Sequence, residues 1–334
     1  MKRSVLFFVS GLLVYFVTGC AQKVSIRALE PAEIDRVAST KKIAVSSFKN
    51  DRVGLSSKIE VKLSNVKIDN KKYFTLVSRK DFDKILEEQR FQNSGLIDPK
   101  TAVNIGELVG AQAIISGNVG RASVQDTYFF EPRVRCADKK CKELEYYKVR
   151  CKKRVVGLSA EMRIVDVTKG DIIFAQTMSP NAVFKHCSDD SRPLPSKEIV
   201  AQRLATTIAN NFVYKLTPHY RTFQVRLLEE PDLDYTDEQE RLLKVSLEYI
   251  KQARYDKAEK FLIELIDATD AQSYLPFYNL GVISEARGKY KEAQEYYSHA
   301  DSLMIEPVEE INKAVIRIKR LIAKREKTRE QLNR

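Results

Sequence analysis

The 334-residue sequence has 57 Lys and Arg residues against 45 Asp and Glu residues, which gives a formal net charge of +12. Its 43% hydrophobic residues exclude a chain too polar to bury a core, and its length favours two domains. The positive balance indicates anionic neighbours such as lipid head groups, cell-wall polymer or an acidic protein.

The N-terminus has the pattern of a secretory signal. Lys2 and Arg3 precede an apolar run over residues 5–17, which is shorter than the roughly 20 residues that a membrane-spanning helix needs. The following VTGC resembles a bacterial lipobox, which implies loss of residues 1–19 and acylation of Cys20, as by palmitate. Ala21 then implies sorting to the outer membrane, by resemblance to enterobacterial lipoproteins. The mature chain keeps a charge of +10, because two positive charges leave with the signal.

Residues 20–40 are polar with weak apolar spacing, and they predict a tether. Strand-like segments at 42–48, 73–77 and 111–124 then alternate with helical patterns, the last of which begins at Asp98-Pro99 and ends at Gly110. This alternation predicts an α/β domain over residues 41–220, with a mixed sheet flanked by helices.

The second half of this domain predicts a hairpin and a long helix. Residues 155–167 and 171–185 flank a turn at Thr168-Lys169-Gly170, and a helix follows from near Ser196. Residues 125–154 interrupt the pattern as a basic, cysteine-containing insertion, with ten Lys or Arg against three acidic residues over 133–154.

The segments SRKDFDKILEEQ, SGLIDPKTAVNIGELVGA and IISGNV resemble, in this order, the signature of the CsgG family. That family includes the curli secretion lipoprotein, holdfast-attachment proteins and LpoB-like activators of cell-wall synthases. The resemblance covers about residues 40–215 and implies a fold rather than a chemistry. In the curli pore, strands from the region of the insertion cross the outer membrane. Here its many lysines and arginines leave no continuous apolar face, which argues against a pore.

Four cysteines remain besides Cys20, and export favours disulfides over free thiols. Their spacing lacks the paired short knuckles of a structural zinc site, and three connectivities are open. If Val167 faces Asp171 in the predicted hairpin, Cys151 lies opposite Cys187. This register favours the pair Cys151–Cys187 and leaves Cys136–Cys141 to close a short basic loop.

Residues 221–238 predict a linker, and residues 239–327 predict helical repeats with a capping helix, followed by a basic tail at 328–334. Segments 254–266 and 288–300 resemble each other, and aligning Tyr255 with Tyr290 gives a period of 35. A period near 34, with Gly281 and Ala293 at the expected offsets, resembles tetratricopeptide repeats. That resemblance implies a groove for a protein partner, and the candidate partner-binding residues are Phe277, Tyr278, Asn279, Tyr290 and Tyr297.

No catalytic, cofactor-binding or metal-binding constellation emerges, and His186, His219 and His299 lie in separate segments. We therefore expect a non-enzymatic outer-membrane lipoprotein, held by its lipid at the periplasmic face. It would act as an adaptor for envelope or surface-structure assembly, binding protein partners through both domains. Anionic lipid or cell-wall contacts and homo-oligomers remain open, and nucleic acid is not expected. The alternative is a subunit of a CsgG-type oligomeric secretion channel.

Overall fold

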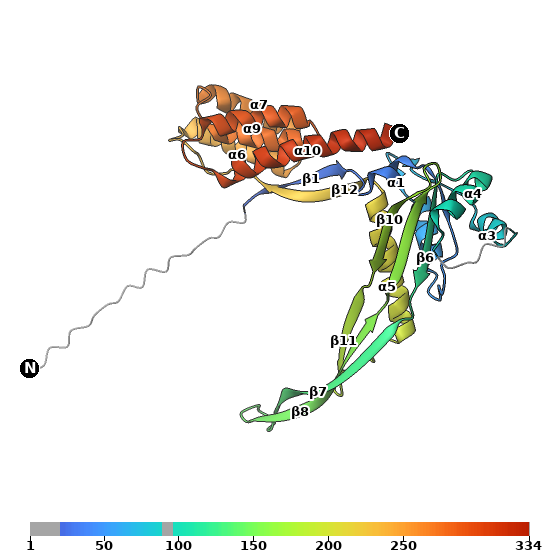
Figure 1. Ribbon diagram of the computed structural model, residues 1–334. Helices are drawn as coiled ribbons and strands as arrows, with labels where there is room; N and C mark the ends of the chain where they lie inside the picture. The colour runs from blue at the N-terminus through green and yellow to red at the C-terminus, as the bar shows by residue number, and fades with distance from the viewer. Residues whose placement is uncertain (1–20, 89–95, 334) are drawn as a thin grey trace, which may run out of the picture. The chain divides into compact units, whose positions relative to one another are not determined.

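The computed structural model of the protein describes residues 21–88 and 96–333 (Figure 1). Cys20 and the signal segment lie outside these residues. The chain divides into two units, which are described separately. One unit contains residues 29–220 with 324–334, and the other contains residues up to 28 with 221–323.

The first unit is built around a five-stranded sheet with the order β10-β9-β6-β2-β5. Strand β2 (Lys42–Val45) is parallel to both of its neighbours, β5 (Thr75–Leu76) and the central strand β6 (Ala113–Val119). Antiparallel pairing then adds β9 (Ala160–Asp166) and β10 (Asp171–Met178). The mixed sheet predicted from the alternation of strands and helices is confirmed.

Helices cover both faces of this sheet. Successive residues of a strand point to opposite faces, so neighbouring apolar residues of β6 join different cores. Ala113 and Ile115 of β6 join a core with α2 (Leu55–Ser64) and α5 (Lys197–Leu216). Ile114 joins a second core with α3 (Arg79–Glu88) and α4 (Pro99–Val109). The predicted caps of α4 are present, since Asp98 accepts a hydrogen bond from the Thr101 N–H and Gly110 has a left-handed φ of 64°.

Residues 20–40, expected as a tether, are structured where the model describes them. They form β1 (Lys23–Glu30) and the short helix α1 (Asp35–Ser39), and β1 pairs with β12 (His219–Arg226). Val24, Ile26 and Ala28 alternate inward from β1 and are buried, whereas Lys23, Ser25 and Arg27 between them are exposed. β12 likewise occupies the start of the expected linker. A minor hairpin of β3 (Lys67–Ile68) and β4 (Lys71–Lys72) completes the strands around the main sheet.

The basic insertion is a regular hairpin rather than an irregular loop. β7 (Ser123–Cys136) pairs along its whole length with β8 (Leu144–Gly157), and β11 (Asn181–Cys187) adds a third strand in the order β11-β8-β7. The predicted hairpin of residues 155–167 and 171–185 is therefore shared between two sheets. Its register holds from Phe174 outward, after an irregularity between Ile172 and Phe174.

The second unit is mainly helical. It contains α6 (Asp237–Lys251), α7 (Tyr255–Ala268), α8 (Tyr274–Ala286), α9 (Tyr290–Leu303) and most of α10 (Glu309–Asn333). A Cβ at Gly281 would lie 2.5 Å from the ring of Tyr297, so this glycine permits the close packing of α8 on α9. The helical domain predicted after the α/β domain is confirmed, and its assignment as tetratricopeptide repeats stays a prediction. The expected basic tail is the end of α10, where Gln331 is buried and hydrogen-bonds the backbone of Ala32.

Candidate interaction surfaces

The hairpin of β7 and β8 extends beyond its third strand. β11 pairs with β8 only over Cys151–Gly157, so the outer halves of β7 and β8 form a two-stranded arm (Figure 1). We call this part, residues 128–150, the arm. Two-stranded ribbons are marginally stable without cross-links. The arm is closed at both ends by disulfides, Cys151–Cys187 at its base and Cys136–Cys141 at its tip.

One face of the arm is apolar on β7 and basic on β8. Tyr128, Phe130 and Val134 lie at alternate positions of β7 and are 49–66% exposed. Opposite Phe130 lies Arg150, whose guanidinium sits 4.7 Å from the ring centroid of Tyr128. Tyr146, opposite Val134, is 74% exposed. Exposed aromatic side chains beside arginines are enriched at protein interfaces.

Sequence reasoning missed this apolar row. The segment identified as basic was residues 133–154; Tyr128 and Phe130 lie before it, and Val134 and Tyr146 lie within it among lysines and arginines. Three of its members alternate on β7, and the pairing of the two strands adds Tyr146 of β8 beside Val134. The expectation that the lysines and arginines leave no continuous apolar face holds for one side of β8, where Lys148, Arg150 and Lys152 follow one another. It is wrong for the other side, where Tyr147, Val149 and Cys151 follow one another and belong to a small apolar cluster with Phe129.

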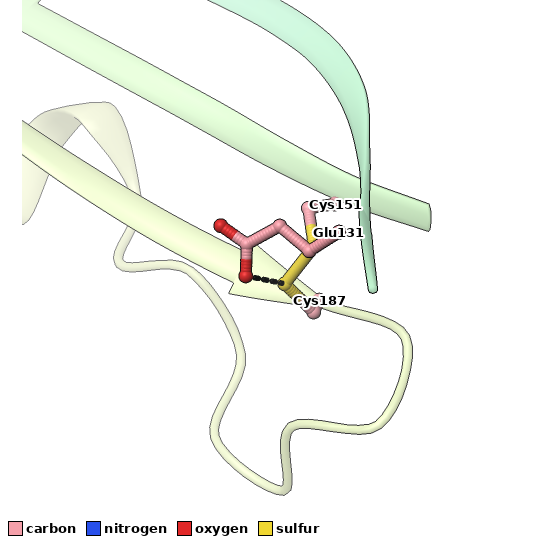
Figure 2. Close-up of side chains that lie close together, drawn as sticks. All are labelled: Glu131, Cys151 and Cys187. Carbon is pink, nitrogen blue, oxygen red and sulfur yellow. Dashed lines mark hydrogen bonds between the residues drawn. A yellow bond between two sulfur atoms is a disulfide. The ribbon is translucent and has the colours of Figure 1, made fainter. Parts of the chain in front are cut away.

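The opposite face carries an ion-pair cluster around Glu131, beside the disulfide of Cys151 and Cys187 (Figure 2). The Glu131 carboxylate accepts hydrogen bonds from Lys185 Nζ at 2.9 Å and from Arg133 at 3.1 Å. These bonds, the one from Lys185 foremost, lower the pKa of Glu131. Although Cys187 Sγ lies 3.9 Å from a Glu131 oxygen, both sulfurs are covalently bonded and the carboxylate is neutralised. The cluster therefore orders the arm and is not a metal site in this state.

The tip of the arm is an ordered cationic loop. The Asp138 carboxylate accepts hydrogen bonds from the backbone N–H groups of Lys142 at 2.6 Å and Glu143 at 3.1 Å. These backbone bonds, the one from Glu143 first, lower the pKa of Asp138 and keep it ionised. Lys139 and Lys140 are exposed at the same loop. The tip thus presents positive charge on a fixed backbone.

The predicted partner-binding residues of the helical unit are largely buried. Tyr278, Asn279 and Tyr297 are at most 1% exposed, and Tyr290 is 7% exposed. Two of these side chains are hydrogen-bonded to the chain's own backbone. The Tyr278 hydroxyl donates to the Arg226 carbonyl at 2.8 Å, and the Asn279 side chain bonds both backbone groups of Leu228.

The expectation that these residues bind a partner is therefore not supported. Phe277, the fifth of them, is half-buried and its ring stacks on His299, with centroids 5.4 Å apart. The physical reason is the segment after β12, which returns along α8 and saturates its polar groups. Nothing in the repeat pattern predicts where that segment lies.

A buried ion pair links α8, α9 and α10 in the helical unit. Glu285 is fully buried, and Arg317 binds its two oxygens at 2.8 Å each. The Tyr297 hydroxyl donates to the same carboxylate at 2.6 Å. Burial, reinforced by the neighbouring Glu285, raises the pKa of Tyr297 far above its usual value. The tyrosine therefore stays a neutral donor at all physiological pH values.

The other predicted site residues do not converge. His186 Nδ1 lies 2.8 Å from the Arg192 carbonyl oxygen, and His219 Nδ1 lies 3.1 Å from that of Thr217. Within residues 21–88 and 96–333, the group of Glu131, Cys151 and Cys187 is the one place where potential metal ligands gather. In the same residues, no helix is both long and apolar enough to cross a membrane.

Comparison with known protein families finds a match for one segment of the chain. Residues 32–125 match the family model described as "Curli production assembly/transport component CsgG". The matched segment contains β2, α2, α4 and β6, so this part of the sheet is CsgG-like. The match covers less than a third of the chain, and the helical unit lies outside it.

Among solved structures, the crystal structure of lipoprotein GNA1162 from Neisseria meningitidis is similar at 14% identity. The alignment covers 52% of this chain and 98% of that chain, with a TM-score of 0.27. No curated protein matches the chain.

Proposed function

We propose that this protein is a lipid-anchored adaptor of the bacterial cell envelope, which uses the arm to bind an envelope protein. The CsgG-like segment supports an envelope role, since the family description names curli assembly and transport. The VTGC sequence supports acylation of Cys20 after export. Two disulfides fit an oxidising compartment outside the cytoplasm.

The single observation that carries the adaptor role is the exposed row of Tyr128, Phe130, Val134 and Tyr146 beside Arg150. Large apolar side chains are costly to leave in water, and a contiguous exposed set marks an interaction surface. The disulfides and the Glu131 cluster hold this set in place, so a partner meets a preformed surface. Basic residues around the row favour a partner with acidic residues around an apolar centre.

Photo-crosslinking in intact cells tests the proposal. A benzophenone amino acid replaces Phe130 or Tyr146 on the apolar face, and Thr127 on the opposite face serves as the matched control. We expect one discrete crosslinked protein from positions 130 and 146 and much less of it from 127. Equal crosslinking from both faces would contradict a directional surface. Cys20→Ser should move the protein out of the membrane fraction, and an unchanged fraction would contradict the lipid anchor.

A second candidate function is the channel subunit of the CsgG type. The length of the hairpin and its exposed apolar row favour it, whereas the basic residues of β8 oppose it. Crosslinks from position 130 to a second copy of the chain, together with ring oligomers in detergent and conductance in planar bilayers, would favour the channel. Crosslinks to a different protein without conductance would favour the adaptor.

A further inference from the structure

A cavity of about 470 Å³ lies in the first unit, outside the carboxyl ends of β2 and β6. These strands are parallel neighbours, and their connections diverge: β2 leads to β5 on one side, and β6 leads towards β9 on the other. Such a divergence is the switch point of an open α/β sheet, where ligands bind in a crevice beyond the strand ends. The cavity has the size of a small-molecule site.

The lining of the cavity is partly apolar, and two of the loops that form it are held together. Val53, Val119 and Leu158 supply apolar lining. The two loops are tied together, because Asn50 Nδ2 donates to Asn118 Oδ1 at 3.1 Å and Lys49 forms a parallel bridge with Asn118. The cavity is thus formed before any ligand arrives, which reduces the entropic cost of binding.

The rim of the cavity is cationic. Arg52, Arg121 and Lys197 line it, against a single acidic residue, Glu198. Arg52 and Lys197 have no ion-pair partner among the residues that the structure describes. Unpaired cations that line one concave surface favour an anionic ligand, because the positive charges attract it and can donate charge-assisted hydrogen bonds to it.

The first turn of α5 adds backbone donors to this rim. Ser196 caps the helix by accepting from the Ile199 N–H at 3.3 Å. The N–H groups of Lys197 and Glu198 have no acceptor within the described part of the chain. At the start of a helix, such groups and the helix dipole favour an anion.

We propose that this cavity binds a small organic anion. Its phosphate or carboxylate group would lie at the first turn of α5, near Arg52 and Lys197, and its apolar part would pack against Val53 and Leu158. The site is separate from the arm. A ligand here would contact the loops after β2 and β6, which also lead into α2 and β7.

Isothermal titration of the mature chain tests the proposal, with phenyl phosphate and benzoate as probes. Two controls separate charge from apolar contact. Inorganic phosphate carries the charge without an apolar group, and neutral benzyl alcohol carries the apolar group without a charge. We expect phenyl phosphate or benzoate to bind with one-to-one stoichiometry and each control to bind at least tenfold more weakly. The stronger of the two anions identifies the head group. If inorganic phosphate binds as tightly as phenyl phosphate, the cavity has no role and the proposal fails.

Charge-reversal variants locate the site. Arg52→Glu and Lys197→Glu should each weaken binding by about tenfold or more, because each removes a charge-assisted hydrogen bond and adds repulsion. Lys139→Glu at the arm tip makes the same change in net charge and should leave binding unchanged. Ala122→Phe, which fills part of the cavity without changing charge, should also weaken it. Equal affinity in all four variants, or no saturable binding of either organic anion at millimolar concentration, would overturn the proposal.

Discussion

The buried pair of Glu285 and Arg317 provides the sharpest test of the helical unit. Replacing Arg317 by Ala leaves the Glu285 carboxylate fully buried with one remaining donor, the Tyr297 hydroxyl. Removing one partner of a buried ion pair destabilises a protein by about 3–5 kcal/mol. The Arg317 side chain is itself 23% exposed, so we expect Arg317→Ala to lower the free energy of unfolding by about 3 kcal/mol, near the lower end of this range.

The matched control is the pair of Arg287 and Glu259, whose side chains are 35% and 29% exposed. A pair this accessible is worth about 1 kcal/mol or less, so Arg287→Ala should be nearly neutral. The double variant Glu285→Gln/Arg317→Met removes both charges and should recover much of the loss, because no uncompensated charge remains buried.

Hydrogen exchange measured by mass spectrometry is the suitable assay, because it reports on each helix and the chain contains no Trp for fluorescence. The protection of α8 and α9 should fall by about two powers of ten in Arg317→Ala, since each 1.4 kcal/mol changes an equilibrium tenfold. If Arg317→Ala and Arg287→Ala reduce protection equally, the carboxylate does not depend on Arg317, and the reasoning from burial is refuted.

Three further changes test the packing, the disulfides and the acid stability. Gly281→Val places a side chain where a Cβ would already lie 2.5 Å from a ring of α9, so it should lower stability by about 1–3 kcal/mol in urea denaturation, and an unchanged midpoint would contradict the close packing. Cys151→Ala/Cys187→Ala removes a cross-link between residues 36 apart and should lower the free energy of unfolding by about 2–4 kcal/mol. Proteolysis of the arm should then be faster, whereas wild-type rates would mean that the backbone hydrogen bonds of the strands hold the arm without the disulfide. Hydrogen bonds from Arg36 lower the pKa of Asp171 in the folded protein. Their contribution to folding stability is therefore fully present above the pKa of an aspartate in the unfolded chain, about 3.9, and is lost as the pH falls through the lowered pKa of the folded state. Asp171→Asn should therefore reduce the fall in melting temperature between neutral pH and the acid range, and an identical fall in both proteins would count against this ion pair.

The sequence by itself predicted those elements whose boundaries depend on neighbouring residues in the chain. The Asp98-Pro99 start and the Gly110 end of α4 follow from capping preferences, and both are present. The 35-residue period aligned Tyr255 with Tyr290, and these two tyrosines are the first residues of α7 and α9. Antiparallel register follows from a turn by simple counting. Counting from an assumed pair of Val167 and Asp171 placed Cys151 opposite Cys187, where the structure has them. The assumed pair is wrong, because Asp171 pairs with Asp166, and the irregularity between Ile172 and Phe174 shifts the ladder into the predicted register.

The tertiary structure alone decided the surfaces, because a surface depends on what the rest of the chain covers. Tyr278 and Asn279 have the composition of a binding groove, but the backbone of residues 226–228 saturates them. The exposed row on the arm takes three residues from β7 and one from β8, and only the pairing of the strands brings Tyr146 beside Val134. The anion cavity likewise joins the loops after β2 and β6 to the start of α5, segments far apart in the chain. Periodicity reports what one segment presents to its neighbours, whereas long-range packing determines which of those faces meets solvent.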